Sequence, residues 1–149
     1  MELEVRRTRS SPSLHSSVLS ASQSAWQRLW YEEPAQQAVS EVTTNLSWGY
    51  TGTCVTWMSG SGHDDWLELT GWRRVAFSTA SSGTRCDPYV WYRTSGTYKN
   101  PYFCATIDTW TKYYYNTVRG YPDGSKGYSA SAKKWGGCSA LLSYHRSYG

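Results

Sequence analysis

Short runs in which apolar and polar residues alternate fill the chain from Trp48 onward and predict β-strands. In YTGTCVTWMS, Val55 and Trp57 fall on one side of an extended chain and the residues between them on the other. Gly, Asp-Pro and Asn-Pro separate further runs of the same kind, which are WRRVAFSTAS, PYVWYRTS, YFCATIDTWTKYYYNTVRGY, GYSASAKKW and SALLSYHR. Their Thr, Val, Tyr and Trp content suits a pleated, half-buried surface. About six short strands therefore predict an all-β fold, a small antiparallel sandwich or barrel.

A different pattern precedes this region and predicts a tail. Residues 1–25 are rich in Ser and basic residues, with few aromatics before Trp26, a composition typical of disorder. The segment SAWQRLWYEE then contains good helix formers, and Trp26 and Trp30 are spaced as on one face of a helical turn. Pro34 interrupts that run. We therefore expect residues 1–45 to form a flexible tail with a short helix, and residues 46–149 to form the β-domain.

The stretch TKYYYNTVRGYPDGSKGY, residues 111–128, predicts a strand, a turn and the start of another strand. Pro122-Asp123-Gly124 supplies the turn, because Pro fixes φ and Gly tolerates the left-handed conformation. Alternation along the first strand sends Tyr113 and Tyr115 to one face and Tyr114 to the other. One set packs in the core and the other faces solvent, and the sequence leaves open which set is outside.

The cysteines predict two disulfide bonds. Cys54, Cys86, Cys104 and Cys138 contain no CxxC pair, so a zinc site is poorly supported. An even cysteine count in a small domain rich in Gly, Ser and Tyr favours disulfides instead. A weak internal echo, in which CVTW resembles CATI and FSTAS resembles YSASA, indicates a duplicated unit of about 50 residues. If each unit is closed by its own bridge, the pairs are Cys54–Cys86 and Cys104–Cys138.

Disulfides indicate an extracellular, secreted protein. The N-terminal stretch MELEVRRTRSSPSLHSSVLSASQSAW contains no apolar segment of roughly 7–15 residues, which an export signal requires. No apolar stretch of the chain is long enough to cross a bilayer. The expectation of secretion thus depends on the cysteines alone.

Catalytic and metal chemistry have weak support, and we expect a protein that is not an enzyme and has no cofactor or metal. His63 lies in the Gly-rich SGSGHDDWLEL, near Asp64 and Asp65. A histidine with carboxylates can act as a base or ligate a metal. There is no second His at ligand spacing, no nucleophile motif and no calcium-loop register. His63 with Asp65 is the remaining candidate, and an exposed polar loop is the simpler interpretation.

Aromatic side chains mixed with cations give the stronger functional signal. The chain has nine Trp and thirteen Tyr but two Phe, and a net charge of +4. Rings beside polar groups suit sugars, and they also suit single-stranded nucleic acid, which the modest charge excess makes the weaker ligand. We therefore expect a non-enzymatic module that binds a glycan or a cell-envelope component, with peripheral membrane contact an option. The candidate ligand-binding residues are Trp91, Arg93, Tyr113, Tyr115, Arg119 and Tyr121.

The C-terminal third, residues 113–148, resembles the lactococcin-type bacteriocins. The resemblance is carried by YYNTVRGYPDGSKGYSASAKKWGGCSA, with its Thr117-Val118 pair, its Gly-rich turn and Trp135. It implies a small secreted β-sheet protein that acts on the bacterial cell wall by binding, so no catalytic residues carry over. The chain departs from that family in its four cysteines, its long N-terminal segment and its lack of a leader. Two alternative functions follow: an antibacterial or cytotoxic protein, and an assembly subunit that docks through its Trp-bearing tail.

Overall fold

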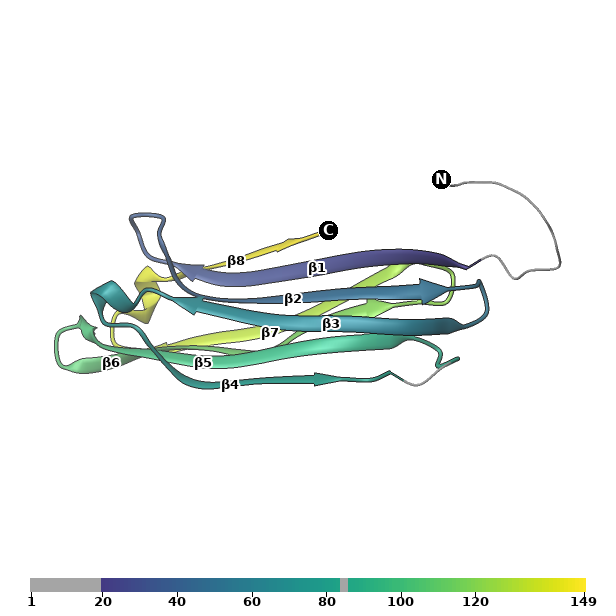
Figure 1. Cartoon of the computed structure of the whole chain (residues 1–149). Helices are drawn as coiled ribbons and strands as arrows, with labels where there is room; N and C mark the ends of the chain where they lie inside the picture. The colour runs from purple at the N-terminus through teal and green to yellow at the C-terminus, as the bar shows by residue number, and fades with distance from the viewer. Residues whose placement is uncertain (1–19, 84–85) are drawn as a thin grey trace, which may run out of the picture.

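The protein is a sandwich of two antiparallel sheets, seen in a computed structural model that describes residues 20–83 and 86–149 (Figure 1). One sheet, here sheet A, has the strand order β3-β2-β1-β8, and the other, sheet B, has the order β4-β5-β6-β7. The strands are β1 (Ala21–Glu32), β2 (Ala38–Tyr50), β3 (Val55–Trp66), β4 (Arg73–Ser81), β5 (Val90–Cys104), β6 (Ile107–Gly120), β7 (Lys126–Gly136) and β8 (Ser143–Tyr148). Two 3₁₀ turns, η1 (Glu68–Thr70) and η2 (Ser139–Leu141), precede β4 and β8. The all-β expectation is confirmed, and the described residues contain no α-helix.

The expected boundary at residue 45 is wrong, because β1 and β2 are integral strands of sheet A. Ala25, Leu29 and Tyr31 alternate into the core, while Trp26 and Trp30 lie on the outer face. A spacing of four places two residues on one face of a strand as well as on one face of a helical turn. The expected short helix is therefore a strand. Residues 1–19 of the expected flexible tail lie outside the described residues.

The two halves of the chain have the same topology. In the first half β1, β2 and β3 form a meander in sheet A, and β4 crosses over to pair with β5. In the second half β5, β6 and β7 form a meander in sheet B, and β8 crosses back to pair with β1. Equivalent strands begin about 70 residues apart. A structural repeat therefore exists, but its unit is about 70 residues long, so the expected unit of about 50 residues is wrong.

The disulfide pairing is confirmed as Cys54–Cys86 and Cys104–Cys138. The first bridge joins the residue before β3 to the segment after β4, and so links the two sheets. The second joins the end of β5 to the segment before η2, at the opposite end of the sandwich. The bridges are not equivalent by the strand repeat. The pairing was right, while the duplication argument that favoured it was not.

The core has two apolar clusters with a polar layer between them. One cluster, at the η1–η2 end, includes Trp72, Tyr98 and Tyr113, and the other includes Trp48 and Val118. The layer between them contains Gln27, Thr44, Thr94 and Asn116, all fully buried. The Thr44 hydroxyl lies 2.8 Å from the Thr94 hydroxyl, and Gln27 Nε2 donates to Asn116 Oδ1 at 2.9 Å. Hydrogen bonds across the layer tie sheet A to sheet B and fix which residues of each strand face inward.

Candidate functional site

The outer face of sheet B carries alternating aromatic and cationic side chains, and we call it the basic aromatic face. Strand register places these side chains on one side, because directly paired residues point to the same face of a sheet. Lys99 pairs with Trp110, Trp110 with Trp135, and Trp91 with Arg119. The face is formed by Arg73 (β4), Trp91, Arg93 and Lys99 (β5), Asp108, Trp110, Lys112, Tyr114, Tyr115 and Arg119 (β6), and Lys133 and Trp135 (β7).

Each half of this face has a cluster of rings covered by cations. In one half the Trp110 and Trp135 rings stack with centroids 5.4 Å apart and planes 4° from parallel. Lys99 Nζ lies 5.2 Å from the Trp110 centroid and Lys133 Nζ lies 5.9 Å from that of Trp135. In the other half the Arg93 guanidinium lies 4.8 Å from the Trp91 ring and 5.7 Å from the Tyr115 ring. Such pairs are held by the attraction of a cation for the ring quadrupole.

A β-bulge in the middle of β6 decides which tyrosines are outside. Tyr113 pairs with Ala132 and Tyr115 with Ser131, so Tyr114 is an extra residue on β6. A bulge resets the alternation of a strand. As a result, Tyr113 is 0% exposed, whereas Tyr114 is 44% and Tyr115 is 37% exposed. The expectation that Tyr113 and Tyr115 share a face is therefore wrong, and Tyr113 is a core residue.

The buried environment of Tyr113 explains why it cannot serve a ligand. Its hydroxyl lies 2.7 Å from Ser40 Oγ and donates to the Ser40 carbonyl at 2.8 Å, in sheet A. Burial raises the pKa of the Tyr113 hydroxyl above its ordinary value. The phenol therefore links the two sheets as a neutral group, and solvent does not reach it.

Next to the bulge, the basic aromatic face contains a pocket of about 350 Å³. Its lining is small and hydroxyl-rich where β4 and β5 run side by side, and it is cationic and aromatic along β6. The Ser95 hydroxyl donates to the Tyr114 carbonyl at 2.8 Å, which fixes the bulge against β5. The pocket is lined by Ala76, Phe77, Ser78, Ser95, Gly96, Thr97, Lys112, Tyr113 and Tyr114.

The outer faces of sheets A and B differ in whether their cationic side chains pair with carboxylates. On sheet A, Arg28 pairs with Glu41, and His145 Nε2 lies 3.2 Å from Glu32 Oε1. On the basic aromatic face the recorded ion pair among described residues is Lys99–Asp108, at 3.8 Å. Arg93, Lys112 and Lys133 lie over rings, and Arg93 Nε also donates to Thr117 Oγ1 at 3.1 Å. These contacts are with neutral groups, which leaves positive charge for an anion.

Of the candidate residues taken from the sequence, the structure brings Trp91, Arg93 and Tyr115 together on this face. Arg119 and Tyr121 lie at its edge, where both contact the Tyr89 ring, with centroid distances of 5.6 Å in each case. The sequence analysis missed a second group, for which strand pairing was the needed signal: Lys99, Trp110, Lys112, Tyr114, Lys133 and Trp135.

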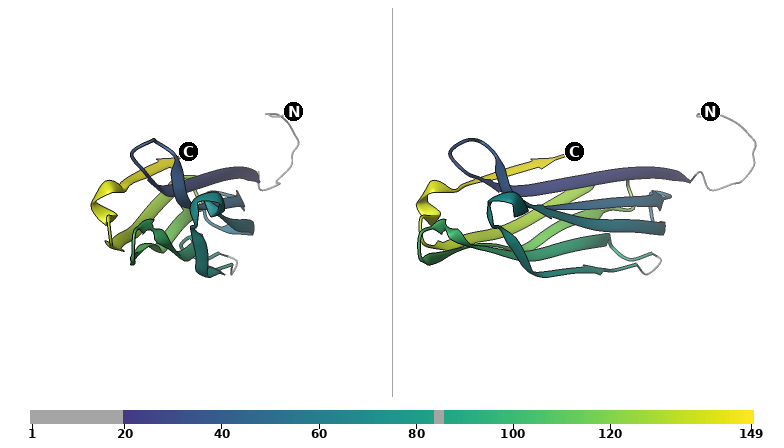
Figure 2. Two further views of the ribbon diagram at one scale, coloured as in Figure 1. Left: turned by 90° about the vertical axis from the view of Figure 1, so that its left-hand side faces the viewer. Right: turned by 60° about the vertical axis from the view of Figure 1, so that its left-hand side comes forward.

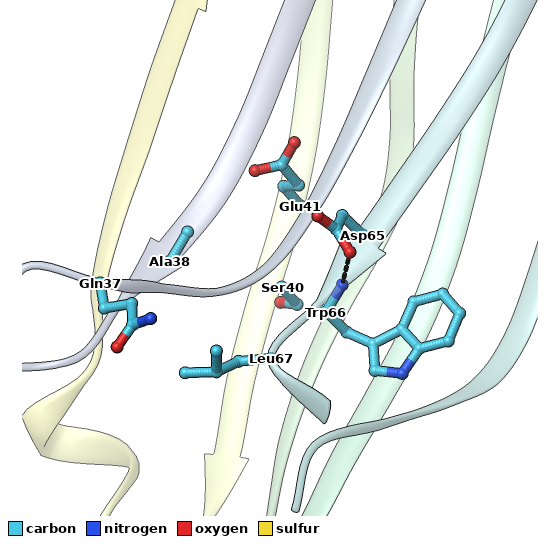
Figure 3. A pocket seen from close by; sticks show the side chains of 7 residues that line it. All are labelled: Gln37, Ala38, Ser40, Glu41, Asp65, Trp66 and Leu67. Atoms are coloured by element: carbon cyan, nitrogen blue, oxygen red, sulfur yellow. Dashed lines mark hydrogen bonds between the residues drawn. The ribbon is translucent and has the colours of Figure 1, made fainter. Parts of the chain in front are cut away.

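His63 lies on strand β3 on the outer face of sheet A, so its placement in a loop is wrong. Its ring nitrogen lies 3.1 Å from Ser61 Oγ, while Asp65 Oδ1 accepts from the Trp66 amide at 2.9 Å. Asp65 lines a separate pocket of about 230 Å³ with Glu41, and His63 does not (Figure 3). Asp64 points to the other face, where Arg74 and Tyr98 bind it. The described residues contain no group of three or more His, Cys, Asp or Glu able to hold a metal.

Comparison of the chain with protein-family models, with curated proteins and with solved structures finds no match. The resemblance to bacteriocins therefore stays a prediction from the C-terminal motif. Among the described residues, no helix has the length and hydropathy needed to cross a bilayer.

Proposed function

We propose that the protein is a secreted, non-enzymatic binding module that recognises an anionic glycan of a cell surface or envelope through the basic aromatic face. The observation that carries this proposal is that Arg93, Lys112 and Lys133 lie over Trp and Tyr rings. Lys99 also lies over a ring, that of Trp110, and is paired with Asp108. Two disulfides are compatible with an extracellular location.

A sugar can interact with both the aromatic rings and the polar or charged groups of the face. The C–H faces of a pyranose stack on aromatic rings, for which the exposed Tyr114 and Tyr115 and the half-buried Trp91 are available. The pocket beside Tyr114 offers hydroxyls from Ser78 and Thr97 to sugar hydroxyls. Lys112 at its edge, with Nζ 4.8 Å from the Tyr114 centroid, places a positive charge where a uronate carboxylate or a sulfate would bind.

Calorimetric titration with defined oligosaccharides tests the proposal. The probes are a sulfated heparin oligosaccharide, a polygalacturonate oligomer and a neutral cello-oligosaccharide. The two anionic probes are expected to bind and the neutral one to bind more weakly. A single-stranded oligonucleotide is included because rings and cations also suit bases and phosphates, and tighter binding of that probe would contradict the proposal.

Two pairs of matched variants locate the site. Trp91→Ala is expected to weaken binding about tenfold through loss of one stacking ring, and Trp57→Ala, on sheet A, is expected to leave it unchanged. Ser78→Tyr fills the pocket from the edge strand β4, and Ser59→Tyr makes the same exposed change on the edge strand β3. Unchanged thermal midpoints show that the fold is intact. Equal effects within each pair would refute the assignment of this face.

A further inference from the structure

One end of the sandwich exposes large apolar side chains from three separate segments. Leu69 in η1 is 95% exposed, Tyr102 and Ile107 near the β5–β6 turn are 73% and 58% exposed, and Leu141 in η2 is 54% exposed. These segments lie at the same end of the sandwich in Figure 1 and in the right-hand view of Figure 2, and this end faces the viewer in the left-hand view of Figure 2. We call these four residues the apolar tip. Clusters of exposed large apolar side chains mark interaction surfaces more often than chance positions do.

The apolar tip is built as a fixed surface. Asn100 Nδ2 donates to the Thr70 carbonyl at 3.0 Å, and Asn100 Oδ1 accepts from the Tyr102 amide at 2.7 Å. Gly71 has a φ of +105°, and a Cβ there would lie 2.6 Å from the Tyr102 ring. Glycine therefore lets η1 approach the β5–β6 turn. The Cys104–Cys138 disulfide ties the same turn to the segment that leads into η2.

The apolar side chains of the tip are exposed although neighbouring apolar residues of the same segments are buried in the core. Trp72, two residues after η1, and Leu142, directly after η2, are 1% and 2% exposed and belong to the apolar cluster at this end. The chain thus buries one apolar side chain after each 3₁₀ turn and leaves Leu69 and Leu141 outside.

Amphipathic and cationic side chains lie next to the tip on sheet B. The stacked Trp110 and Trp135 are near the β5–β6 turn and the end of β7. Three cations accompany them. The acidic groups on this side are Glu68 in η1 and Asp108, which is paired with Lys99, and on the sheet A side of the same end are Glu32, beside His145, and Glu33 in the β1–β2 turn. The cations are Arg73, Lys99 and Lys133. Arg73 and Lys99 are paired across sheet B in the same row as Trp110 and Trp135, and Lys133 lies in the next row. Apolar groups followed by a row of Trp and cations match the hydrocarbon and the headgroup interface of a bilayer.

We propose that the apolar tip docks on a lipid bilayer that contains anionic headgroups, with Leu69, Ile107 and Leu141 inserted at the interface. The turns project separately from the end of the sandwich (Figure 2), and a deformable lipid surface can surround such a convex shape. A stable protein interface needs about 800 Å² of complementary surface on each partner, which a flat partner would not obtain from projecting turns. The cations on the sheet B side of the tip favour anionic over neutral headgroups on that side.

Vesicle flotation tests this inference with the full chain. The probes are vesicles of phosphatidylcholine alone and of phosphatidylcholine mixed with phosphatidylserine. The chain is expected to float with the mixed vesicles and less with the neutral ones. Leu69→Ser combined with Leu141→Ser is expected to reduce binding at least about tenfold, from the lost burial of two leucines. Both residues are exposed, so the thermal midpoint should hold. Trp57→Ser, at the opposite end and 47% exposed, is the control and should bind like the wild type.

Three outcomes would overturn the inference. The first is no flotation with either vesicle, and the second is flotation that the double variant leaves unchanged. The third is a concentration-dependent dimer in light scattering that the double variant abolishes, because a second copy of the chain would then cover the tip. The proposed glycan site is tested separately, since the double variant should bind the oligosaccharide probes as the wild type does.

Discussion

The variant Asn116→Leu tests which residues of β6 face the core and which face solvent. The assignment of the basic aromatic face depends on this alternation. The β6 bulge turns Asn116 inward at the same step at which it turns Tyr115 outward. Asn116 is fully buried, and its side chain makes three hydrogen bonds. Its Oδ1 accepts from Gln27 Nε2 at 2.9 Å, and its Nδ2 donates to the carbonyls of Gln27 and Val42 at 2.8 and 3.1 Å. Each such bond contributes about 0.5–1.5 kcal/mol net. Leucine has a similar size but can make none of them.

The expected loss is therefore about 2–4 kcal/mol of unfolding free energy, after a partial gain from the added apolar burial. Urea unfolding followed by fluorescence measures it, and the thermal midpoint should fall on the order of 10 °C. Asn45→Leu, on the outer face of sheet A, is the matched control and should stay within about 0.5 kcal/mol of the wild type. If Asn116→Leu is as stable as the control, Asn116 faces solvent and the assignment of Tyr114 and Tyr115 to the outer face fails.

Two further predictions concern the bridges and the buried phenols. Replacing Cys104 and Cys138 by Ser should lower the free energy of unfolding by about 2–5 kcal/mol, and mass spectrometry of the oxidised wild type should detect no free thiol. Burial, with a smaller contribution from Tyr144, raises the pKa of Tyr31 from 10.0 to about 12. Because the folded state holds this proton more tightly than the unfolded state, the stabilisation is fully present below pH 10.0 and declines as the pH rises to about 12. Urea unfolding across that range should show the decline, and a flat profile would contradict it.

The sequence predicted the strands of the C-terminal two thirds because their period is local. Alternation and turn residues identified β4, β7 and most of β5 and β6. The expected break at Asn100-Pro101 is wrong, because it lies inside β5, and the β5–β6 turn lies inside a stretch expected as a single run. The Pro122-Asp123-Gly124 turn is present, with Gly124 at a φ of +85° and its amide bonded to the Tyr121 carbonyl. The prediction failed at β1, where good helix formers form a strand. Trp26 and Trp30 fit either period, and the pairing with β2 and β8 that decides between them is not local.

Only part of the candidate site could be predicted from the sequence, because alternation is local whereas bulges and strand register are not. Trp91 and Arg93 follow simple alternation on β5 and lie on the face where they were expected to lie together. Tyr113 lies on the opposite face of the sheet, because a bulge shifts the alternation of β6. No residue type in this stretch indicates that bulge. The stacked Trp110 and Trp135 are 5.4 Å apart only because β6 pairs with β7 in one particular register. Register follows from packing of the whole sheet, which one strand's pattern does not contain.

Amide NMR shifts recorded during titration with the sulfated heparin oligosaccharide show which face of the sandwich binds the ligand. Binding on the basic aromatic face should shift the amides of Trp91, Arg93, Lys112 and the Tyr114–Tyr115 bulge, and leave those of sheet A residues such as Trp57 and His63 unmoved. Shifts concentrated on sheet A, or no shifts at saturating oligosaccharide, would contradict it.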